Sequence, residues 1–178
     1  MRFLRASTIF CAIILASVAF GQGQTRPTAK PQDVDSLDSI MKALYDVISG
    51  PAGQKRDWDR FRTLFVADAR MGAAYRTPKG DIRYFSVNIE AYIKDDDAIM
   101  VEKGFFEKEL HRHVDTFGNI SQVFSTFESR FKSEDSKPFE RGINSIQLMN
   151  DGKRWWVVSI YWQSEDDKVK LPDEWLKS

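Results

Sequence analysis

Hydrophobic residues recur at helical spacing near the start of the patterned part of the chain. Intervals of three and four separate Val34, Leu37, Ile40, Met41, Leu44, Val47 and Ile48. This period puts them on one face of a helix. Asp35 or Ser36 can cap its start, and Ser49-Gly50-Pro51 ends it.

Two more helices are predicted further along the chain. Asp57 can cap a short one, which has apolar residues along one side: Trp58, Phe61, Leu64 and Phe65. Residues 69–75 then form a first strand, followed by a turn and a short extended piece. Ser86 can cap the third helix, which runs to about Lys103 and ends at Gly104.

From Gly104 onward the pattern changes to strands. Four long stretches rich in aromatic and β-branched residues cover 105–115, 119–132, 139–150 and 153–164, separated by the turns TFGN, SEDSK and NDGK. Three N-terminal helices followed by a curved antiparallel sheet predict an α+β fold whose helices cover one sheet face.

Two segments in this order resemble a known superfamily. RTLFVADARM (62–71) resembles the way into its first strand, and INSIQLMNDGKRWWVVSIYW (143–162) resembles its last two strands. The chain is thus similar to the nuclear transport factor two-like, or SnoaL-like, superfamily. The resemblance implies one cone-shaped α+β barrel over residues 36–178, with a pocket under the helices. It also implies a homodimer through the outer sheet face.

The N-terminus predicts export. A basic start precedes an apolar run, Ala6 to Phe20, which ends in small residues, so residues 1–21 read as a signal peptide. Residues 22–35 are then a polar, proline-containing flexible linker. We expect a secreted or periplasmic protein with no stable membrane insertion once the signal is cleaved. Cleavage removes Cys11, so the mature chain has no disulfide.

The charge balance excludes some partners. The chain has 26 basic and 26 acidic residues, and the signal carries two of the basic ones. The mature chain is therefore slightly acidic, which argues against nucleic acid as a partner.

The register of the sheet decides which polar side chains share a face. We place Asp115 opposite Ile120 across the first turn, and Arg130 opposite Glu140 across SEDSK. The pocket face predicted in this way carries Phe124, Thr126, Asn144, Trp155, Ser159 and Tyr161, with Tyr92 facing it from the third helix. A slip of one residue would exchange sides for half of this set. Some of these aromatics can equally be ordinary core residues.

Both histidines lie on one predicted strand, where His111, His113 and Asp115 alternate. Two such histidines could reach one zinc ion, but H-x-H alone is a weak signal and the chain has no other histidine, so no metal and no cofactor are expected. His111 with Glu109 could instead act as an acid–base pair. The adjacent acids Asp95, Asp96 and Asp97 read as a solvated helix face.

Two functions stay open. The first is a binding module for a small apolar or aromatic ligand. The second is a small pocket enzyme of isomerase, dehydratase or cyclase type. Steroid-isomerase chemistry is disfavoured, because Met71–Ala74 contains no acid where the resemblance implies a carboxylate base, and Asn144-Ser145-Ile146 contains none at the second acidic position.

Overall fold

The computed structural model describes residues 27–176, so the expected signal peptide lies outside the described part of the chain. The helices are α1 (Pro31–Val34), α2 (Leu37–Ile48), α3 (Trp58–Thr63), α4 (Ile89–Lys103) and the 3-10 helix η1 (Asp173–Leu176). The strands are β1 (Phe65–Arg76), β2 (Ile82–Asn88), β3 (Phe106–Phe117), β4 (Ile120–Arg130), β5 (Glu140–Asn150) and β6 (Trp155–Ser164). Within residues 27–176, no helix is both long and apolar enough to cross a bilayer.

Side-chain caps fix where the helices begin. The Ser36 hydroxyl accepts a hydrogen bond from the Ser39 amide, which confirms the predicted start of α2. The Asp57 carboxylate accepts one from the Arg60 amide and starts α3 as predicted. The predicted Ser86 cap of α4 is wrong, because β2 continues to Asn88, whose side chain caps the helix instead.

The segment expected as a flexible linker is partly folded. Pro31–Val34 forms the single turn α1, and Val34 is buried in the core. Arg60 donates two hydrogen bonds of 2.9 Å to the Asp33 carboxylate, so the guanidinium binds it in a fork. This contact lowers the pKa of Asp33. The linker expectation is therefore wrong for this turn, because burial and an ion pair hold it on the domain.

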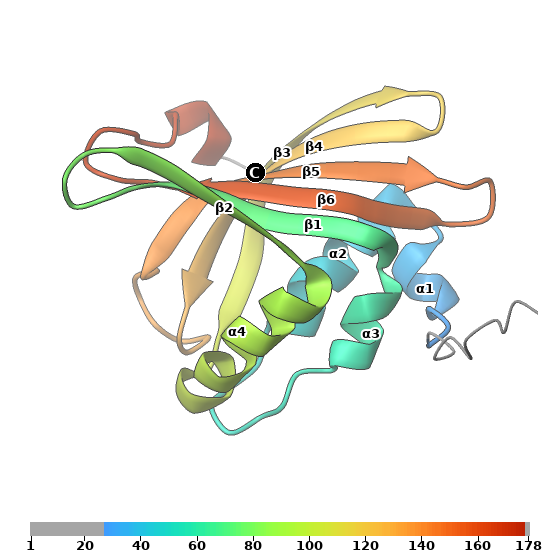
Figure 1. Cartoon of the computed structure of the whole chain (residues 1–178), viewed down its shortest axis with the longest axis horizontal. Coiled ribbons are helices and arrows are strands. Elements are labelled where there is room, and N and C mark those ends of the chain that lie inside the picture. The colour runs from blue at the N-terminus through green and yellow to red at the C-terminus, as the bar shows by residue number, and fades with distance from the viewer. Residues whose placement is uncertain (1–26, 177–178) are drawn as a thin grey trace, which may run out of the picture.

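Six strands form one curved sheet in the order β2-β1-β6-β5-β4-β3. Helices α2, α3 and α4 lie on one side of it, and the C-terminal segment with η1 lies on the other (Figure 1). The neighbouring strands are antiparallel except β1 and β6, which run parallel. The predicted α+β architecture is confirmed, although the sheet is mixed rather than wholly antiparallel.

The predicted register is wrong by one residue across the SEDSK loop. Ser129, not Arg130, pairs with Glu140, so β3 and β4 present the opposite faces from those expected relative to β5. Two irregularities change the faces again: one between Glu109 and His111 in β3, and one between Gln147 and Leu148 where β5 meets β6.

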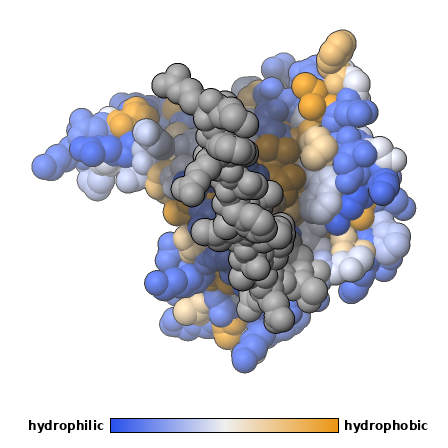
Figure 2. All heavy atoms as spheres, turned by 45° about the vertical axis from the view of Figure 1, so that its right-hand side comes forward, coloured by the Kyte–Doolittle hydropathy of each residue, from blue (hydrophilic) through white to orange (hydrophobic). Residues whose placement is uncertain are grey.

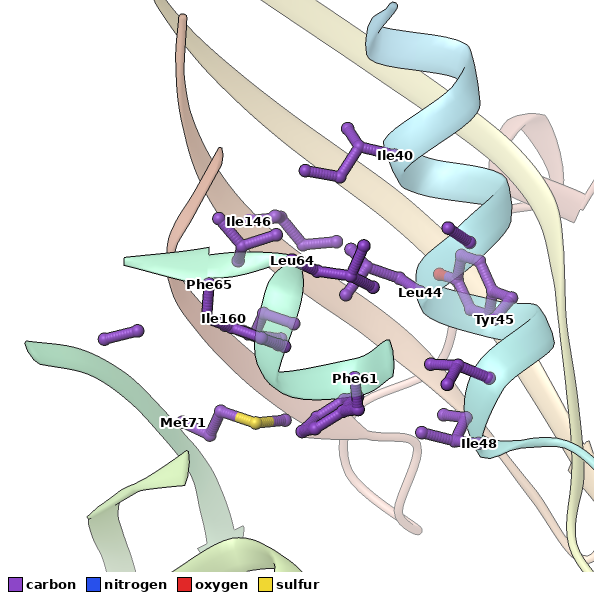
Figure 3. Packing of buried hydrophobic residues seen from close by; sticks show 14 of the residues in the cluster. Ile40, Leu44, Tyr45, Ile48, Phe61, Leu64, Phe65, Met71, Ile146 and Ile160 are labelled. Atoms are coloured by element: carbon purple, nitrogen blue, oxygen red, sulfur yellow. The ribbon is translucent and has the colours of Figure 1, made fainter. Parts of the chain in front are cut away.

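The core lies between the helices and the concave side of the sheet. In Figure 3, Leu44, Tyr45 and Ile48 extend from α2 into this space, and Phe61 and Met71 point into it from the other side. Outside the core, the surface seen in Figure 2 is mostly hydrophilic, with hydrophobic residues in small separate groups.

Buried Arg56 joins the ends of α2 and α4. Its guanidinium donates to the carbonyl oxygens of Ile48 (2.7 Å) and Gly50 (2.7 Å), where α2 ends, and to that of Met100 in α4 (3.1 Å). Since three carbonyls receive charge-assisted hydrogen bonds from one planar group, this side chain fixes the two helix ends relative to each other.

Arg56→Lys is expected to lower the free energy of unfolding by about 3 kcal/mol, because one ammonium cannot reach all these carbonyls and buried acceptors then lose charged donors. Urea unfolding measures the change. The control is Arg83→Lys at an exposed position of β2, which should have little effect. Equal stability of the two variants would contradict the role given to Arg56.

Candidate functional site

A cavity of about 160 Å³ lies between the helices and the concave side of the sheet. Its wall is mainly apolar and aromatic, and its polar side chains are few. The lining residues are Leu44, Tyr45, Ile48, Phe61, Met71, Tyr92, Asp96, Met100, Phe105, Glu107, Phe127, Glu140, Asn144, Ile146, Ile160 and Trp162. Small apolar cavities with a few fixed polar groups are typical ligand sites.

The polar part of the wall centres on Glu107. Its carboxyl group accepts hydrogen bonds from the Ser129 hydroxyl (2.9 Å) and, at a longer 3.4 Å, from the Asn144 amide. Asn144 also donates to the Tyr45 hydroxyl at 3.2 Å. Four elements, α2, β3, β4 and β5, therefore converge on one polar spot.

A hydrogen-bond chain leads from this spot out of the cavity. Ser125 donates to Glu109 at 2.5 Å, and the single Ser125 proton is thereby used. The Tyr45 hydroxyl, 2.6 Å from Ser125, must then be the donor in that pair. Arg112 holds Glu109 from the other side. The phenol proton of Tyr45 is thus directed away from the cavity.

Glu107 is poised to titrate near neutral pH. Desolvation by burial raises its pKa to about 7, and the charge of Glu140 adds to the rise. The two hydrogen bonds from Ser129 and Asn144 oppose this effect and are outweighed. A carboxyl group with such a pKa can both hold and release a proton at physiological pH.

A second carboxyl group with a raised pKa comes from α4. Desolvation raises the pKa of Asp96 to about 6, with a smaller contribution from Asp95. The interpretation of the three adjacent aspartates as a solvated face is therefore wrong in part. Asp95 is exposed, but Asp96 lines the cavity, and Asp97 accepts a hydrogen bond of 2.6 Å from the Trp58 indole.

The expected pair of His111 and Glu109 does not form in the cavity. The irregularity in β3 leaves Glu109 on the concave side with Arg112 and turns His111 to the convex side. There the His111 ring lies 5.8 Å from the ring of Trp175 in η1. A bulge shifts side-chain alternation by one residue, so these two side chains cannot act on one ligand here.

Of the predicted ligand-binding residues, Asn144 and Tyr92 line the cavity. Phe124 and Tyr161 instead border a shallower groove on the convex face. The others lie outside the cavity lining: Thr126 is fully buried, Ser159 is half-buried, and Trp155 packs against the edge of the core. The one-residue register error explains Phe124 and Thr126, and the irregularity at Gln147 and Leu148 explains Ser159 and Tyr161.

His113 and Asp115 stay close to each other but lie at the surface, with 3.2 Å between their side chains. In residues 27–176, no group of three or more His, Cys, Asp or Glu side chains is arranged to hold a metal ion.

Part of the convex face is covered by the chain itself. Trp175 packs edge-on against both His111 and Phe124. The homodimer through this face stays a prediction. A partner could contact only the part of the face that the C-terminal segment with η1 does not cover.

Sequence reasoning missed Glu107 as the central polar residue. Glu107 and Glu109 alternate in one predicted strand, so their side chains share a face, and the structure places both on the concave side. The two-residue spacing of these glutamates was a signal for Glu107 in the sequence, but the interpretation used the histidines nearer the turn.

A curved sheet that wraps over helices around such a cavity is the nuclear transport factor 2-like, or cystatin-like, fold. A protein of unknown function with a cystatin-like fold from Nostoc punctiforme PCC 73102 is similar, with a TM-score of 0.56, 10% identity, and coverage of 79% of this chain and 97% of that chain. An NTF2-like protein from Pseudomonas putida KT2440 has a TM-score of 0.56, 13% identity, and coverage of 77% and 92%.

A proposed ketosteroid isomerase from Parabacteroides distasonis ATCC 8503 has a TM-score of 0.51 and 11% identity, covering 82% of this chain and 100% of that chain. No protein-family model matches the chain, and no curated protein sequence matches it either. At these identities the likeness shows the fold alone.

The half-buried carboxyl group of Glu107 gives a signed pH prediction. Its pKa in the folded protein lies above the ordinary value of 4.5, so the folded state binds the proton more tightly than the unfolded state does. Proton binding therefore stabilises the folded state at low pH, and this contribution is lost as the pH rises through about 7. Glu107→Gln removes the titration. The unfolding free energy of this variant relative to the wild type should therefore rise between pH 5 and pH 8, by up to about 3 kcal/mol.

Urea titrations at several pH values measure this difference. Glu102→Gln, at an exposed position of α4, is the matched control and should leave the pH dependence unchanged. A difference between Glu107→Gln and the wild type that is constant with pH would contradict the raised pKa.

Proposed function

We propose that this protein binds a compact organic molecule in the cavity under its helices. The observation that carries the proposal is the polar spot formed by Glu107, Asn144 and Tyr45 in an otherwise apolar wall. Placing a carboxyl group in a mainly apolar and aromatic wall costs free energy. A ligand that hydrogen-bonds to Glu107 would make use of this group.

The volume of the cavity limits the size of the ligand. A cavity of about 150 Å³ lined by apolar side chains holds one benzene molecule. The cavity here has nearly the same size, about 160 Å³, so it suits a single ring or a short branched chain. A four-ring steroid is too large for it, which adds to the sequence argument against steroid-isomerase chemistry.

Benzyl alcohol is a suitable probe, because it combines one ring with a hydroxyl that can donate to Glu107. It should raise the melting temperature by about 4 °C at ten times its Kd. Ile160→Phe adds a ring at the cavity wall and should abolish the shift. Val158→Phe, on the same strand but exposed, should preserve it. A shift of equal size in both variants would place the ligand elsewhere.

A second candidate function is acid–base catalysis with Glu107 as the base. The pKa of about 7 favours this role, because proton transfer is most efficient when the pKa of the catalytic group matches the working pH. The reaction class would be proton abstraction next to a carbonyl group. Glu107 here replaces the pair of His111 and Glu109 that the sequence suggested.

Deuterium exchange tests the catalytic candidate without knowledge of the natural substrate. Cyclohexanone has one ring and exchangeable protons beside its carbonyl. In D₂O the wild type should speed their exchange, observed by NMR, and Glu107→Gln should return the rate to that of buffer. Exchange that is equally fast with both proteins, or no faster than in buffer, speaks against catalysis and leaves ligand binding standing.

A further inference from the structure

We propose that the ligand of this cavity is a small organic cation, an amine or quaternary ammonium with a compact hydrocarbon body. The inference rests on the proposed function, since it names the ligand class for the same cavity. Two independent features carry it: the sign of the charges in the wall and the density of aromatic rings.

All of the charged side chains in the wall are acidic. Asp96 comes from α4, Glu107 from β3 and Glu140 from β5, and no lysine, arginine or histidine of residues 27–176 lines the cavity. Ser164 donates a hydrogen bond to Glu140, which satisfies that group without neutralising it. An ammonium ion would supply the missing positive charge, whereas an anionic ligand would meet like charges at short range in a medium of low dielectric constant.

Other charged groups near Glu107 are engaged outside the cavity. Glu107 also borders an open groove between α2 and β3, and most of the cations there have acidic partners. Lys108 and Arg130 both pair with Glu128, and Arg112 pairs with Glu109. The remaining charged side chains of the groove are Lys42, Asp46 and Asp135. The cavity side of Glu107 therefore faces acidic groups and neutral ones.

Aromatic rings form much of the remaining wall, and the faces of such rings attract cations. The six are Tyr45, Phe61, Tyr92, Phe105, Phe127 and Trp162. Phe61 and Tyr92 are stacked on each other with 5.7 Å between their centroids. Carboxyl groups together with ring faces are the usual means of holding an ammonium group.

Hydrogen-bond polarity favours the same ligand class. Asn144 already donates to both Tyr45 and Glu107, and the proton of Tyr45 is directed toward Ser125. The polar spot thus offers the ligand an acceptor, the Glu107 carboxyl. An ammonium group brings donors and charge together, and a neutral alcohol brings only a donor.

Three probes of nearly equal size separate the possibilities: benzylamine, benzyl alcohol and benzoate, measured by calorimetry at pH 7.5 and about 0.15 M salt. Benzylammonium should bind at least tenfold more tightly than benzyl alcohol, and benzoate should not bind. Glu107→Gln and Asp96→Asn should each weaken the amine at least fivefold, and by a larger factor than the alcohol, because the amide oxygen of the variant still accepts a hydrogen bond from a hydroxyl but carries no charge. Glu102→Gln, on the exposed side of α4, should affect neither probe.

The affinity for the amine should also rise between pH 5.5 and 7.5, as the carboxyl groups of Asp96 and Glu107 ionise, and binding should release protons in that range. The groups that face Glu107 across the cavity are Tyr45 from α2, Tyr92 and Asp96 from α4, and Glu140 and Asn144 from β5, and Ser129 of the neighbouring β4 donates to its carboxyl group. Glu107→Gln should reduce the pH dependence while the alcohol shows little in either protein.

Benzyl alcohol binding as tightly as benzylamine, or amine affinity unchanged in both acidic variants, would overturn the cation inference and leave the cavity as a binding site for neutral ligands. If neither benzylamine nor benzyl alcohol binds the wild type more tightly than it binds Ile160→Phe, both the inference and the proposed function fail. The variants report on binding only if they fold, so their circular dichroism and melting curves accompany each measurement.

Discussion

The geometry of the cavity depends on one buried guanidinium. Arg56 binds carbonyl oxygens at the end of α2 and in the last turn of α4, so the two helices that cover the cavity keep a fixed separation. The chain approaches closely on both sides of it. A Cβ atom on Gly50 would lie 2.7 Å from the Arg56 guanidinium, and one on Gly104 would lie 2.5 Å from a backbone oxygen. Glycine at position 50 leaves room for the guanidinium, and glycine at position 104 lets the end of α4 approach the backbone of Phe131 and Ala52. The burial of Arg56 lowers its pKa, and the three carbonyl oxygens of α2 and α4, with that of Gln54 at 2.6 Å as a fourth, compensate for the desolvation.

The helices were predictable from the sequence because their signals are local. Hydrophobic period, caps and stops fixed α2 and α3, and the strands of the second half were visible as long β-branched and aromatic stretches. Which side chains of those strands point to the concave side was not predictable. This depends on the pairing register across the SEDSK loop, where one residue decides it, and on bulges that have no sequence signature of their own. His111 and Tyr161 moved to the convex face for this reason. Asn144 kept its side, and Tyr92 was correctly expected to face the sheet because its helix was correctly phased.

The irregularity that removed His111 from the cavity left two acidic residues of β3 on the concave side. Glu107 and Glu109 both stay on the concave side, but they have different surroundings. Glu109 is paired with Arg112, whereas Glu107 meets hydroxyl, amide and aromatic groups, and this difference leaves Glu107 with the raised pKa. The two carboxyl groups thus differ in role. Glu109 forms a structural ion pair, whereas Glu107 can change its protonation state near neutral pH.

The ion pair outside the cavity also sets the polarity within it. Because Arg112 holds Glu109 as an acceptor, Ser125 must donate to Glu109 and Tyr45 must donate to Ser125. The phenol oxygen is then left to accept from Asn144, whose amide therefore points its N–H groups at Tyr45 and Glu107. The half-buried Arg112 thereby orders four groups over three strands and one helix, and Glu107, once ionised, presents a hydrogen-bond acceptor to the cavity. In the proposed complex the ligand supplies the proton of the hydrogen bond to Glu107.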